Sequence, residues 1–427
     1  MRIFSLRFLF LTAVSVLGFF VPSMASGFAV AEENATAATI GVLKSWIKEH
    51  ELNDQNLSTL HSEAFSTTAL TANEAQQATT ELWNARTKFL KQALQAEFDN
   101  REIVIDDLKM PFWYKVFGDP PAEGRSLFIS MHGGGGAPAA VNDQQYENQK
   151  RLYEPDEGIY LVPRAATNTW DLWHQSHIDL FFERLIRDMI LFENVNPDRV
   201  YIMGYSAGGD GVYQLAPRMA DRLAAAAMMA GHPNESRPEG LRNIGFAIHV
   251  GADDSAYNRN AKAEEWGKLL DALQAGDKNG YAHKVSLHAG RGHWMNLEDA
   301  VAVPWMTGFT RQVWPNRIAW VQDDVRHERF YWLQVPHESA TAGDRTIVSV
   351  NGNEIAIEHC DAKVITILLS DSLLDLDKSV SVKLPSGVIS QYDVKRTIAQ
   401  IAESLAERFD KAACYSAKID LQIRESE

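Results

Sequence analysis

The chain has 427 residues, of which 45% are hydrophobic and 23% are charged. These values are typical of a folded protein of two or three domains and exclude a disordered or collagen-like chain. The formal net charge of −15 argues against a nucleic-acid partner and an anionic membrane surface, and slightly against acidic substrates, because all of them would be repelled. The two cysteines, Cys360 and Cys414, are too few for a disulfide scaffold, and whether they pair stays open.

The first 25 residues have the pattern of a secretory signal peptide. Arg2 and Arg7 precede an apolar run over 8–21, and small residues follow at 23–25. Cleavage after residue 31, at a second site of small residues, is an alternative. We therefore expect a protein exported to the periplasm or the extracellular space, with no stable membrane span after cleavage. The competing interpretation is an uncleaved membrane anchor.

Two changes of pattern divide the rest of the chain. Residues 32–100 show apolar residues at helical spacing, which predicts a helical N-terminal segment. In residues 101–317 short apolar runs alternate with amphipathic stretches, which predicts an α/β domain with a mainly parallel sheet covered on both faces. The predicted strands are Glu102–Ile105, Phe112–Phe117, Leu127–Met131, Ile159–Val162, Val200–Met203, Ala224–Ala230, Phe246–Val250 and Val285–His288, and the predicted helices are Ile178–Glu193, Gly208–Met219 and Ala261–Gln274.

Residues 318–427 predict a second, mostly β domain. Turn residues separate its short strands, most clearly at Asn351-Gly352-Asn353. No catalytic motif occurs in it, and its partner is unknown. The predicted strands are Ala319–Gln322, Phe330–Val335, Thr346–Val350, Glu354–Glu358, Val364–Leu369, Val380–Leu384 and Lys418–Ile423, and the one predicted helix is Val394–Ala413.

The strongest chemical motif is Gly204-Tyr205-Ser206-Ala207-Gly208. It follows a predicted strand and precedes a predicted helix. Flanking glycines allow the tight turn that lifts a nucleophilic serine out of a sheet, and the helix N-terminus supplies N–H groups beside it. The motif predicts Ser206 as a nucleophile.

A glycine run, His132–Gly136, follows the predicted strand Leu127–Met131. Acyl transfer develops an oxyanion that backbone N–H donors stabilise, and glycines let the backbone approach the substrate closely. We expect the N–H groups of Gly133 or Gly134, together with that of Ala207, to form an oxyanion hole. The alternative is a plain flexible loop. His132 is expected to be structural.

His293 is the predicted general base. It lies in Gly290-Arg291-Gly292-His293-Trp294, after the predicted strand Val285–His288, and a loop at the carboxyl end of a strand is a suitable place for a base that must reach Ser206. His249 and His288 are weaker candidates because they lie within predicted strands, and His232 is weaker because no acid candidate follows it.

The predicted acid is one of two adjacent aspartates, Asp253 and Asp254, which follow the strand Phe246–Val250. Their position between the serine and the histidine gives the order Ser, Asp, His of a nucleophile-elbow hydrolase. Neighbouring side chains point in different directions, so one of the two is expected in the site.

Aromatic residues near these motifs suggest a substrate pocket. Trp170, Trp173, Trp294 and Tyr205 are candidate lining residues, since pockets are mostly apolar, although Trp170 and Trp173 fit a loop that seals the sheet equally well. No metal is expected: His174 and His177 stand three positions apart, but no carboxylate or thiol completes a site.

Taken together, the glycine run, the elbow, His293, and Asp254 three positions after Gly251 resemble the α/β-hydrolase superfamily. Within this superfamily, they resemble the esterases of the polyhydroxybutyrate depolymerase and feruloyl esterase type. The resemblance covers residues 112–309 and implies Asp254, rather than Asp253, as the acid. The sequence has no recognisable binding module or Ser/Thr-rich linker, which argues against hydrolysis of a polymer.

The sequence thus predicts an exported serine hydrolase that cleaves a small-molecule carboxylic ester through Ser206, His293 and Asp254 and an acyl-enzyme, without a cofactor. Two alternatives stay open. One is a serine peptidase on the same fold, and the other is a non-catalytic binding or scaffold protein, because a fold alone does not establish an activity.

Overall fold

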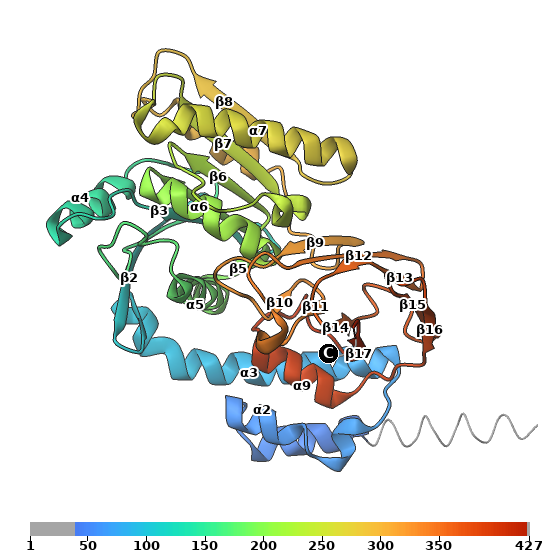
Figure 1. Cartoon of the computed structure of the whole chain (residues 1–427). Helices are drawn as coiled ribbons and strands as arrows, with labels where there is room; N and C mark the ends of the chain where they lie inside the picture. Colours follow the sequence, from blue (N-terminus) through green and yellow to red (C-terminus); the bar gives the residue numbers. More distant parts are fainter. Residues whose placement is uncertain (1–38, 425–427) are drawn as a thin grey trace, which may run out of the picture.

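A computed structural model describes residues 39–424 (Figure 1). The expected signal peptide and its cleavage sites lie outside these residues. Within the described part of the chain, no helix is both long and apolar enough to cross a membrane.

A mixed sheet of eight strands forms the centre of the α/β part. Its strands are β1 (Glu102–Ile105), β2 (Leu108–Phe117), β3 (Arg125–Met131), β4 (Gly158–Pro163), β5 (Val195–Tyr205), β6 (Ala225–Met229), β7 (Gly245–Gly251) and β8 (His283–His288). Their spatial order is β1-β2-β4-β3-β5-β6-β7-β8. β2 pairs antiparallel with both of its neighbours, β1 and β4. The other neighbouring pairs, from β4 and β3 through to β7 and β8, are parallel. This is the strand order of the α/β-hydrolase fold, so the predicted fold class is confirmed.

Helices cover both faces of this sheet, each over its own hydrophobic cluster. On one face α5 (Ser176–Glu193), α6 (Ala207–Arg218) and α7 (Arg259–Gly276) bury apolar residues against the strands. On the other face lie α4 (Ala139–Gln149) and α8 (Ala302–Met306). Because both faces are covered, β3, β4 and β7 are buried along almost their whole length, as their continuous apolar runs predict.

The C-terminal part contains two smaller sheets. One is ordered β10-β11-β14-β17 and the other β16-β15-β13-β12-β9, and their inward-facing residues belong to one hydrophobic cluster. The elements are β9 (Arg317–Val321), β10 (Arg329–Phe330), β11 (Leu333–Gln334), β12 (Arg345–Asn351), β13 (Glu354–Cys360), β14 (Val364–Leu369), β15 (Val380–Lys383), β16 (Ile389–Tyr392), α9 (Ile398–Glu407) and β17 (Ala417–Gln422).

Three predictions for this part were wrong in detail. The strand expected over Phe330–Val335 is two short strands, because Tyr331 has a left-handed φ of 55° that turns the chain. The helix expected over Val394–Ala413 is confined to α9, because the side chain of Asp410 binds the N–H groups of residues 412 and 413. β16 has a mixed, mostly exposed sequence and was not predicted. Cys360 and Cys414 are both free thiols.

The N-terminal helices connect the two parts. α2 (Asp54–Leu60) and α3 (Ala72–Asn100) pack against α9, and α3 also contacts α5 and β1 (Figure 1). The 29 residues of α3 begin at a capping box, in which Thr71 and Glu74 satisfy each other's backbone N–H groups. A long, well-started helix therefore runs beneath both the α/β part and the C-terminal sheets.

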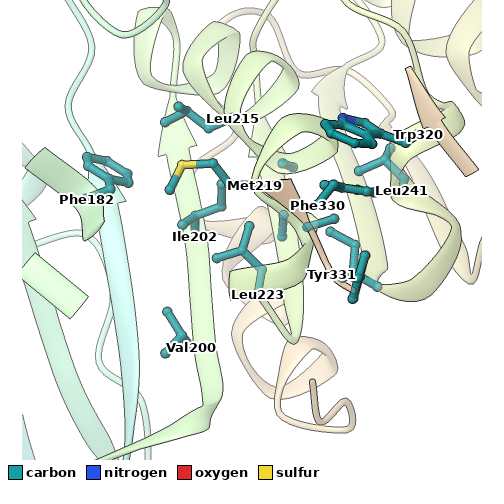
Figure 2. Close-up of a cluster of buried hydrophobic side chains, with 14 of the residues drawn as sticks. Phe182, Val200, Ile202, Leu215, Met219, Leu223, Leu241, Trp320, Phe330 and Tyr331 are labelled. Atoms are coloured by element: carbon teal, nitrogen blue, oxygen red, sulfur yellow. The ribbon is translucent and has the colours of Figure 1, made fainter. Parts of the chain in front are cut away.

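An apolar interface joins the C-terminal part to the α/β sheet. Trp320, Phe330 and Tyr331 lie against Leu241, beside the helix and strand that carry Leu215 and Ile202 (Figure 2). All of these side chains are less than 5% exposed and belong to the same hydrophobic cluster. The core of the α/β part thus continues without a break into the C-terminal part.

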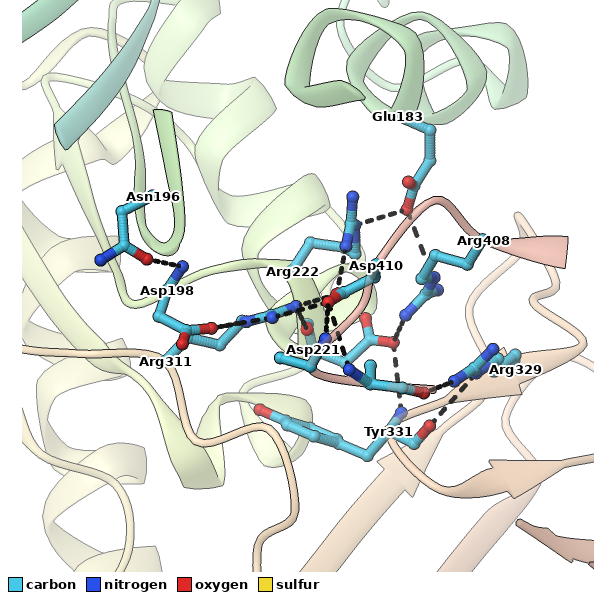
Figure 3. A network of polar contacts seen from close by, with 12 residues as sticks. Glu183, Asn196, Asp198, Asp221, Arg222, Arg311, Arg329, Tyr331, Arg408 and Asp410 are labelled. Carbon is cyan, nitrogen blue, oxygen red and sulfur yellow. Dashed lines mark hydrogen bonds and ion pairs between the residues drawn. The ribbon is translucent and has the colours of Figure 1, made fainter. Parts of the chain in front are cut away.

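Buried ion pairs cross the same interface (Figure 3). Asp410, which follows α9, accepts hydrogen bonds from Arg222 (2.7 Å) and Arg311 (2.5 Å), and all three side chains are almost fully buried. Burial alone would raise the pKa of Asp410, but the Arg311 and Arg222 guanidinium groups hold it below its ordinary value. A second pair links Arg408 to Asp221. We call Asp410, Asp221 and these three arginines the interface network.

Candidate active site

Ser206 stands at the turn between β5 and α6 with φ 58° and ψ −121°, a strained conformation that places a side chain at the top of a sheet. Close backbone approaches require the flanking glycines. A Cβ on Gly204 would lie 2.2 Å from the carbonyl oxygen of Gly208, and a Cβ on Gly208 would lie 2.1 Å from that of Met131. The local sequence therefore allows the turn that lifts Ser206.

His293 is within hydrogen-bond distance of both of its predicted partners. Its Nε2 lies 3.0 Å from Oγ of Ser206, and its Nδ1 lies 2.8 Å from Oδ2 of Asp254. If Nδ1–H donates to the carboxylate, Nε2 is free to accept from the serine hydroxyl, which is the arrangement a general base needs. The structure thus brings the three residues of the candidate triad into one hydrogen-bonded line.

The carboxylate beside His293 belongs to Asp254, which is 2% exposed, whereas Asp253 is exposed. Two hydrogen bonds hold the backbone of Asp254: its N–H donates to the carbonyl of Gly251 (3.0 Å), and its carbonyl accepts from the N–H of Asn260 (3.1 Å). Arg259 lies 3.9 Å from its second oxygen. The buried carboxylate thus has His293 as its hydrogen-bond partner and a cation close to its other oxygen.

Tyr205, the residue before the serine, contacts the histidine loop. Its hydroxyl donates to the carbonyl oxygen of His293 (2.7 Å) and accepts from the N–H of Met295 (3.0 Å). Burial raises its pKa above the ordinary value, so the hydroxyl stays protonated. Two hydrogen bonds therefore fix the loop that presents His293.

The glycine run lies directly beside the serine: a Cβ on Gly133 would be 3.2 Å from Cβ of Ser206. The carbonyl groups of this loop point to fixed partners. Trp173 Nε1 donates to the carbonyl of His132 (2.9 Å), and Nδ1 of His132 contacts the carbonyl of Gly133 at 2.6 Å. In a trans peptide the N–H points opposite to the C=O, so these contacts also orient the N–H groups of Gly133 and Gly134.

The protonation state of His132 follows from its surroundings. Burial lowers its pKa to about 4, so the ring is neutral at pH 7. Its Nε2 lies 3.1 Å from the N–H of Ala165 and can only accept from it, which leaves the proton on Nδ1 for the carbonyl of Gly133. His132 is placed as a structural residue of the loop.

A cavity of about 630 Å³ opens at the candidate triad. One wall is α4, whose residues at helical spacing face the cavity together with the turn that follows the helix. Tyr205 and Trp294 line it, and Trp294 is 48% exposed. The lining consists of Gly133, Gly134, Val141, Gln145, Asn148, Gln149, Arg151, Leu152, Tyr205, Ser206, His293 and Trp294.

The sequence pattern did not predict α4, because the segment contains too few apolar residues to show a helical pattern. Its two ends are nevertheless fixed to the site. Near the start, Asn142 accepts from the N–H of Gly135 (2.8 Å), and at the end Gln149 donates to Ser130 of β3 (2.8 Å). The only available signal was the closeness of this polar stretch to the glycine run.

The other two tryptophans do not line the cavity. Trp173 is fully buried beneath the glycine loop, and Trp170 is 64% exposed outside it, close to Gly136. The expected direct substrate contact of Trp173 is therefore corrected to support of the loop. Among the described residues, no group of three or more His, Cys, Asp or Glu side chains could hold a metal ion, and His174 and His177 belong to no such group.

None of the competing histidines forms a hydrogen bond with the Ser206 side chain in the described part of the chain, and Nδ1 of His232 lies 3.0 Å from Oδ1 of Asn234. His249 is buried, and its Nδ1 lies 3.1 Å from Nε2 of His288. His288 in turn lies 3.3 Å from Glu298. Burial lowers the pKa of His249 to about 3. The two histidines thus contact each other across the neighbouring strands β7 and β8.

Two curated proteins match part of the chain. The putative esterase NocK of Nocardia uniformis subsp. tsuyamanensis is 29% identical over 143 residues, which cover 30% of this chain and 41% of NocK. The bifunctional acetylxylan esterase/xylanase XynS20E of Neocallimastix patriciarum is 31% identical over 137 residues, 31% of this chain and 20% of that protein. This chain is similar to esterases. No protein-family model matches it.

The chain spans less than half of the length of these relatives. Among solved structures, a thermostable esterase is 17% identical with a TM-score of 0.37, covering 49% of this chain and 62% of that one. The carboxylesterase from Mesorhizobium loti is 17% identical with a TM-score of 0.34, covering 49% and 99%. The strand order, rather than these overall superpositions, carries the fold assignment. The resemblance to α/β-hydrolase esterases expected from the sequence is confirmed.

Proposed function

We propose that the chain is an exported serine hydrolase that cleaves small carboxylic esters, with Ser206 as nucleophile, His293 as general base and Asp254 as the acid that orients it. One observation carries the proposal. The side chains of Ser206, His293 and Asp254 form a continuous line of contacts at 3.0 and 2.8 Å, and this line opens into a cavity. Similarity to esterases supports an ester rather than another acyl substrate.

The chemistry proceeds in two halves. Oγ of Ser206 attacks the ester carbonyl carbon while its proton passes to Nε2 of His293, and the tetrahedral intermediate then collapses as the departing alcohol takes that proton. Water next attacks the acyl-enzyme, gives a proton to the same nitrogen, and the acid leaves as Ser206 recovers its proton. Asp254 stabilises the imidazolium in both halves.

Backbone N–H groups stabilise the oxyanion in this proposal. Ala207 is the first residue of α6, where N–H groups have no partner within the helix and the helix dipole is positive. Gly133, beside Ser206, and Gly134 belong to the loop whose peptides are oriented by Trp173 and His132. Donors fixed before the reaction are usually the largest electrostatic contribution to acyl transfer.

Two measurements on the purified chain without its first 25 residues test the proposal. A fluorophosphonate probe should label the wild type and leave Ser206→Ala unlabelled, and 4-nitrophenyl acetate turnover should disappear in the same variant. Equal labelling of the two proteins would refute the nucleophile. Labelling without ester turnover, but with cleavage of a peptide amide, would identify a peptidase. Absence of both activities in the wild type would favour a non-catalytic protein.

Export is part of the same proposal and rests on the sequence of residues 1–25. Fusion of this segment to a reporter that is active only outside the cytoplasm should give signal. Replacement of Arg2 and Arg7 by glutamate should reduce it, because the positive n-region is part of the export signal. Full signal from both fusions would contradict the proposed leader.

A further inference from the structure

The candidate active-site cavity contains a single permanent charge. Among the described residues that line it, Arg151 is the one Lys, Arg, Asp or Glu side chain. Its other polar walls are neutral, with Gln145 and Asn148 on α4 and the indole of Trp294 on the histidine loop. A lone guanidinium in an otherwise uncharged cavity marks the place where a charged part of a ligand would be recognised.

Arg151 differs from the neighbouring cations in having no carboxylate partner. Lys150 pairs with Glu147 (2.6 Å), Arg164 pairs with Asp143 (2.9 Å), and Arg291 pairs with Glu298. No ion pair links Arg151 to any residue in 39–424, and its side chain is exposed. All five donors of its guanidinium therefore face solvent or a ligand.

The backbone that carries Arg151 is held firmly to the sheet. Gln149, two residues earlier, donates to Ser130 Oγ (2.8 Å), and its carbonyl accepts from the hydroxyl of Tyr160 (2.7 Å). Leu152, the next residue, packs against the buried cluster beneath α4. The guanidinium is thus presented from a fixed point, which reduces the entropy that a ligand would have to overcome.

We propose that Arg151 selects esters that carry a carboxylate group, binding that group in the cavity while Ser206 attacks the ester carbonyl. This inference rests on the proposed function. A planar guanidinium and a carboxylate form two parallel hydrogen bonds, which makes the pair both strong and directional. Gln145 and Asn148 supply amide groups, and Trp294 an aromatic face, for the neutral remainder of the substrate.

The negative net charge of the protein disfavours anionic substrates, so a preference for them needs a local cause. A formal charge of −15 repels anionic substrates at long range, and salt screens that repulsion. Arg151 acts at contact distance inside the cavity. A preference for a carboxylate ester would therefore arise from this one side chain, against the overall field of the molecule.

The test compares charged and neutral esters of equal shape. On the acyl side, the 4-nitrophenyl monoester of glutaric acid is compared with the same ester of glutaric acid monoamide. On the alcohol side, 4-acetoxybenzoate is compared with 4-acetoxybenzamide. The measured quantity is kcat/KM for the charged ester divided by that for its neutral counterpart, after subtraction of the spontaneous rate, in the wild type and in Arg151→Gln.

We expect Arg151→Gln to lower this ratio by about tenfold in one of the two arms. The arm that responds tells whether the carboxylate lies on the acyl or the alcohol side. Arg151→Lys should keep part of the preference. Lys150→Gln is the matched control: it removes one positive charge from the adjacent residue without changing the cavity lining, and the ratio should stay at the wild-type value.

Equal ratios in the wild type and Arg151→Gln in both arms would overturn the inference, as would an equal loss in Lys150→Gln. These outcomes are distinct from failure of the proposed function. Hydrolysis of the neutral esters, and its loss in Ser206→Ala, tests the triad independently of any preference for charge.

Discussion

The hydroxyl of Tyr205 donates to the backbone carbonyl of His293, so the residue before the candidate nucleophile fixes the loop of the candidate base. Both hydrogen bonds of this hydroxyl go to that loop, because it also accepts from Met295. The spacing between Ser206 and His293 is therefore set by two neighbouring residues of the elbow, one through its side chain and the other through its strained backbone.

Tyr205→Phe should lower kcat about tenfold and leave KM nearly unchanged, because the aromatic wall stays while the loop loses two hydrogen bonds of about 1 kcal/mol each. Steady-state kinetics with 4-nitrophenyl acetate measures the effect. The rate of fluorophosphonate labelling should fall in parallel. Wild-type kcat in this variant would show that the loop holds His293 without Tyr205.

The two aspartates should differ strongly. Asp254→Asn removes the acceptor of the Nδ1 proton and allows the wrong imidazole tautomer, so we expect kcat to fall by roughly 10³ to 10⁴-fold. Asp253→Asn changes an exposed side chain and should keep kcat within about twofold of the wild type. The opposite ranking would reassign the acid.

Trp173→Phe tests the orientation of the glycine loop. The variant loses the N–H that binds the carbonyl of His132, so kcat should fall about tenfold while KM stays close to the wild-type value, since Trp173 does not line the cavity. Trp266→Phe, at a buried position in α7, controls for the loss of ring volume. It should lower the thermal midpoint to a similar extent without lowering kcat.

Acid should destabilise the fold in a defined pH range. Burial lowers the pKa of His132 to about 4 from an ordinary value near 6.5, so the unfolded chain binds a proton that the folded chain does not bind in this range. The free energy of unfolding should therefore decrease as the pH falls from 6.5 to 4, by about 3 kcal/mol from this group alone. Urea titrations across this range measure the slope, and His132→Asn should make it shallower. An unchanged slope would contradict the burial argument.

Asp410→Ala should destabilise the protein by about 3 to 5 kcal/mol, because Arg222 and Arg311 would then be buried without their shared carboxylate. Urea unfolding gives the value. Asp375→Asn, which breaks an exposed pair with Lys378, is the control and should lower the free energy of unfolding much less. Similar losses in the two variants would show that the interface network contributes no more than a surface ion pair.

Periodicity sufficed for the α/β sheet because its strands are buried on both faces, and each predicted strand overlaps an observed one. The candidate triad was accessible for a related reason, since glycines and strand ends mark its positions. In contrast, the cavity wall that faces the candidate triad could not be predicted from the sequence. α4 is polar and anchored by Asn142 and Gln149 through hydrogen bonds to distant residues, and such contacts leave no local pattern. Arg151 was missed with it.

The C-terminal end of α9 also could not be predicted from the local sequence. An apolar pattern continued through residue 413, but the ion pairs of Arg408 and Asp410 with Asp221, Arg222 and Arg311 take the chain out of the helix. The partners lie about 100 to 190 residues earlier in the sequence. Only the folded arrangement reveals that these charges belong together, and local propensity cannot decide between a longer helix and such a network.

The interface network also ties the stability of the α/β part to a segment that follows it in the chain. Arg222 and Arg311 have Glu183 and Asp198 as further partners, but Asp410 is the carboxylate that both arginines share. Removal of the segment around Asp410 would take away this carboxylate together with part of the surface that buries the two arginines. We therefore expect the α/β part and the C-terminal sheets to unfold together rather than as separate units.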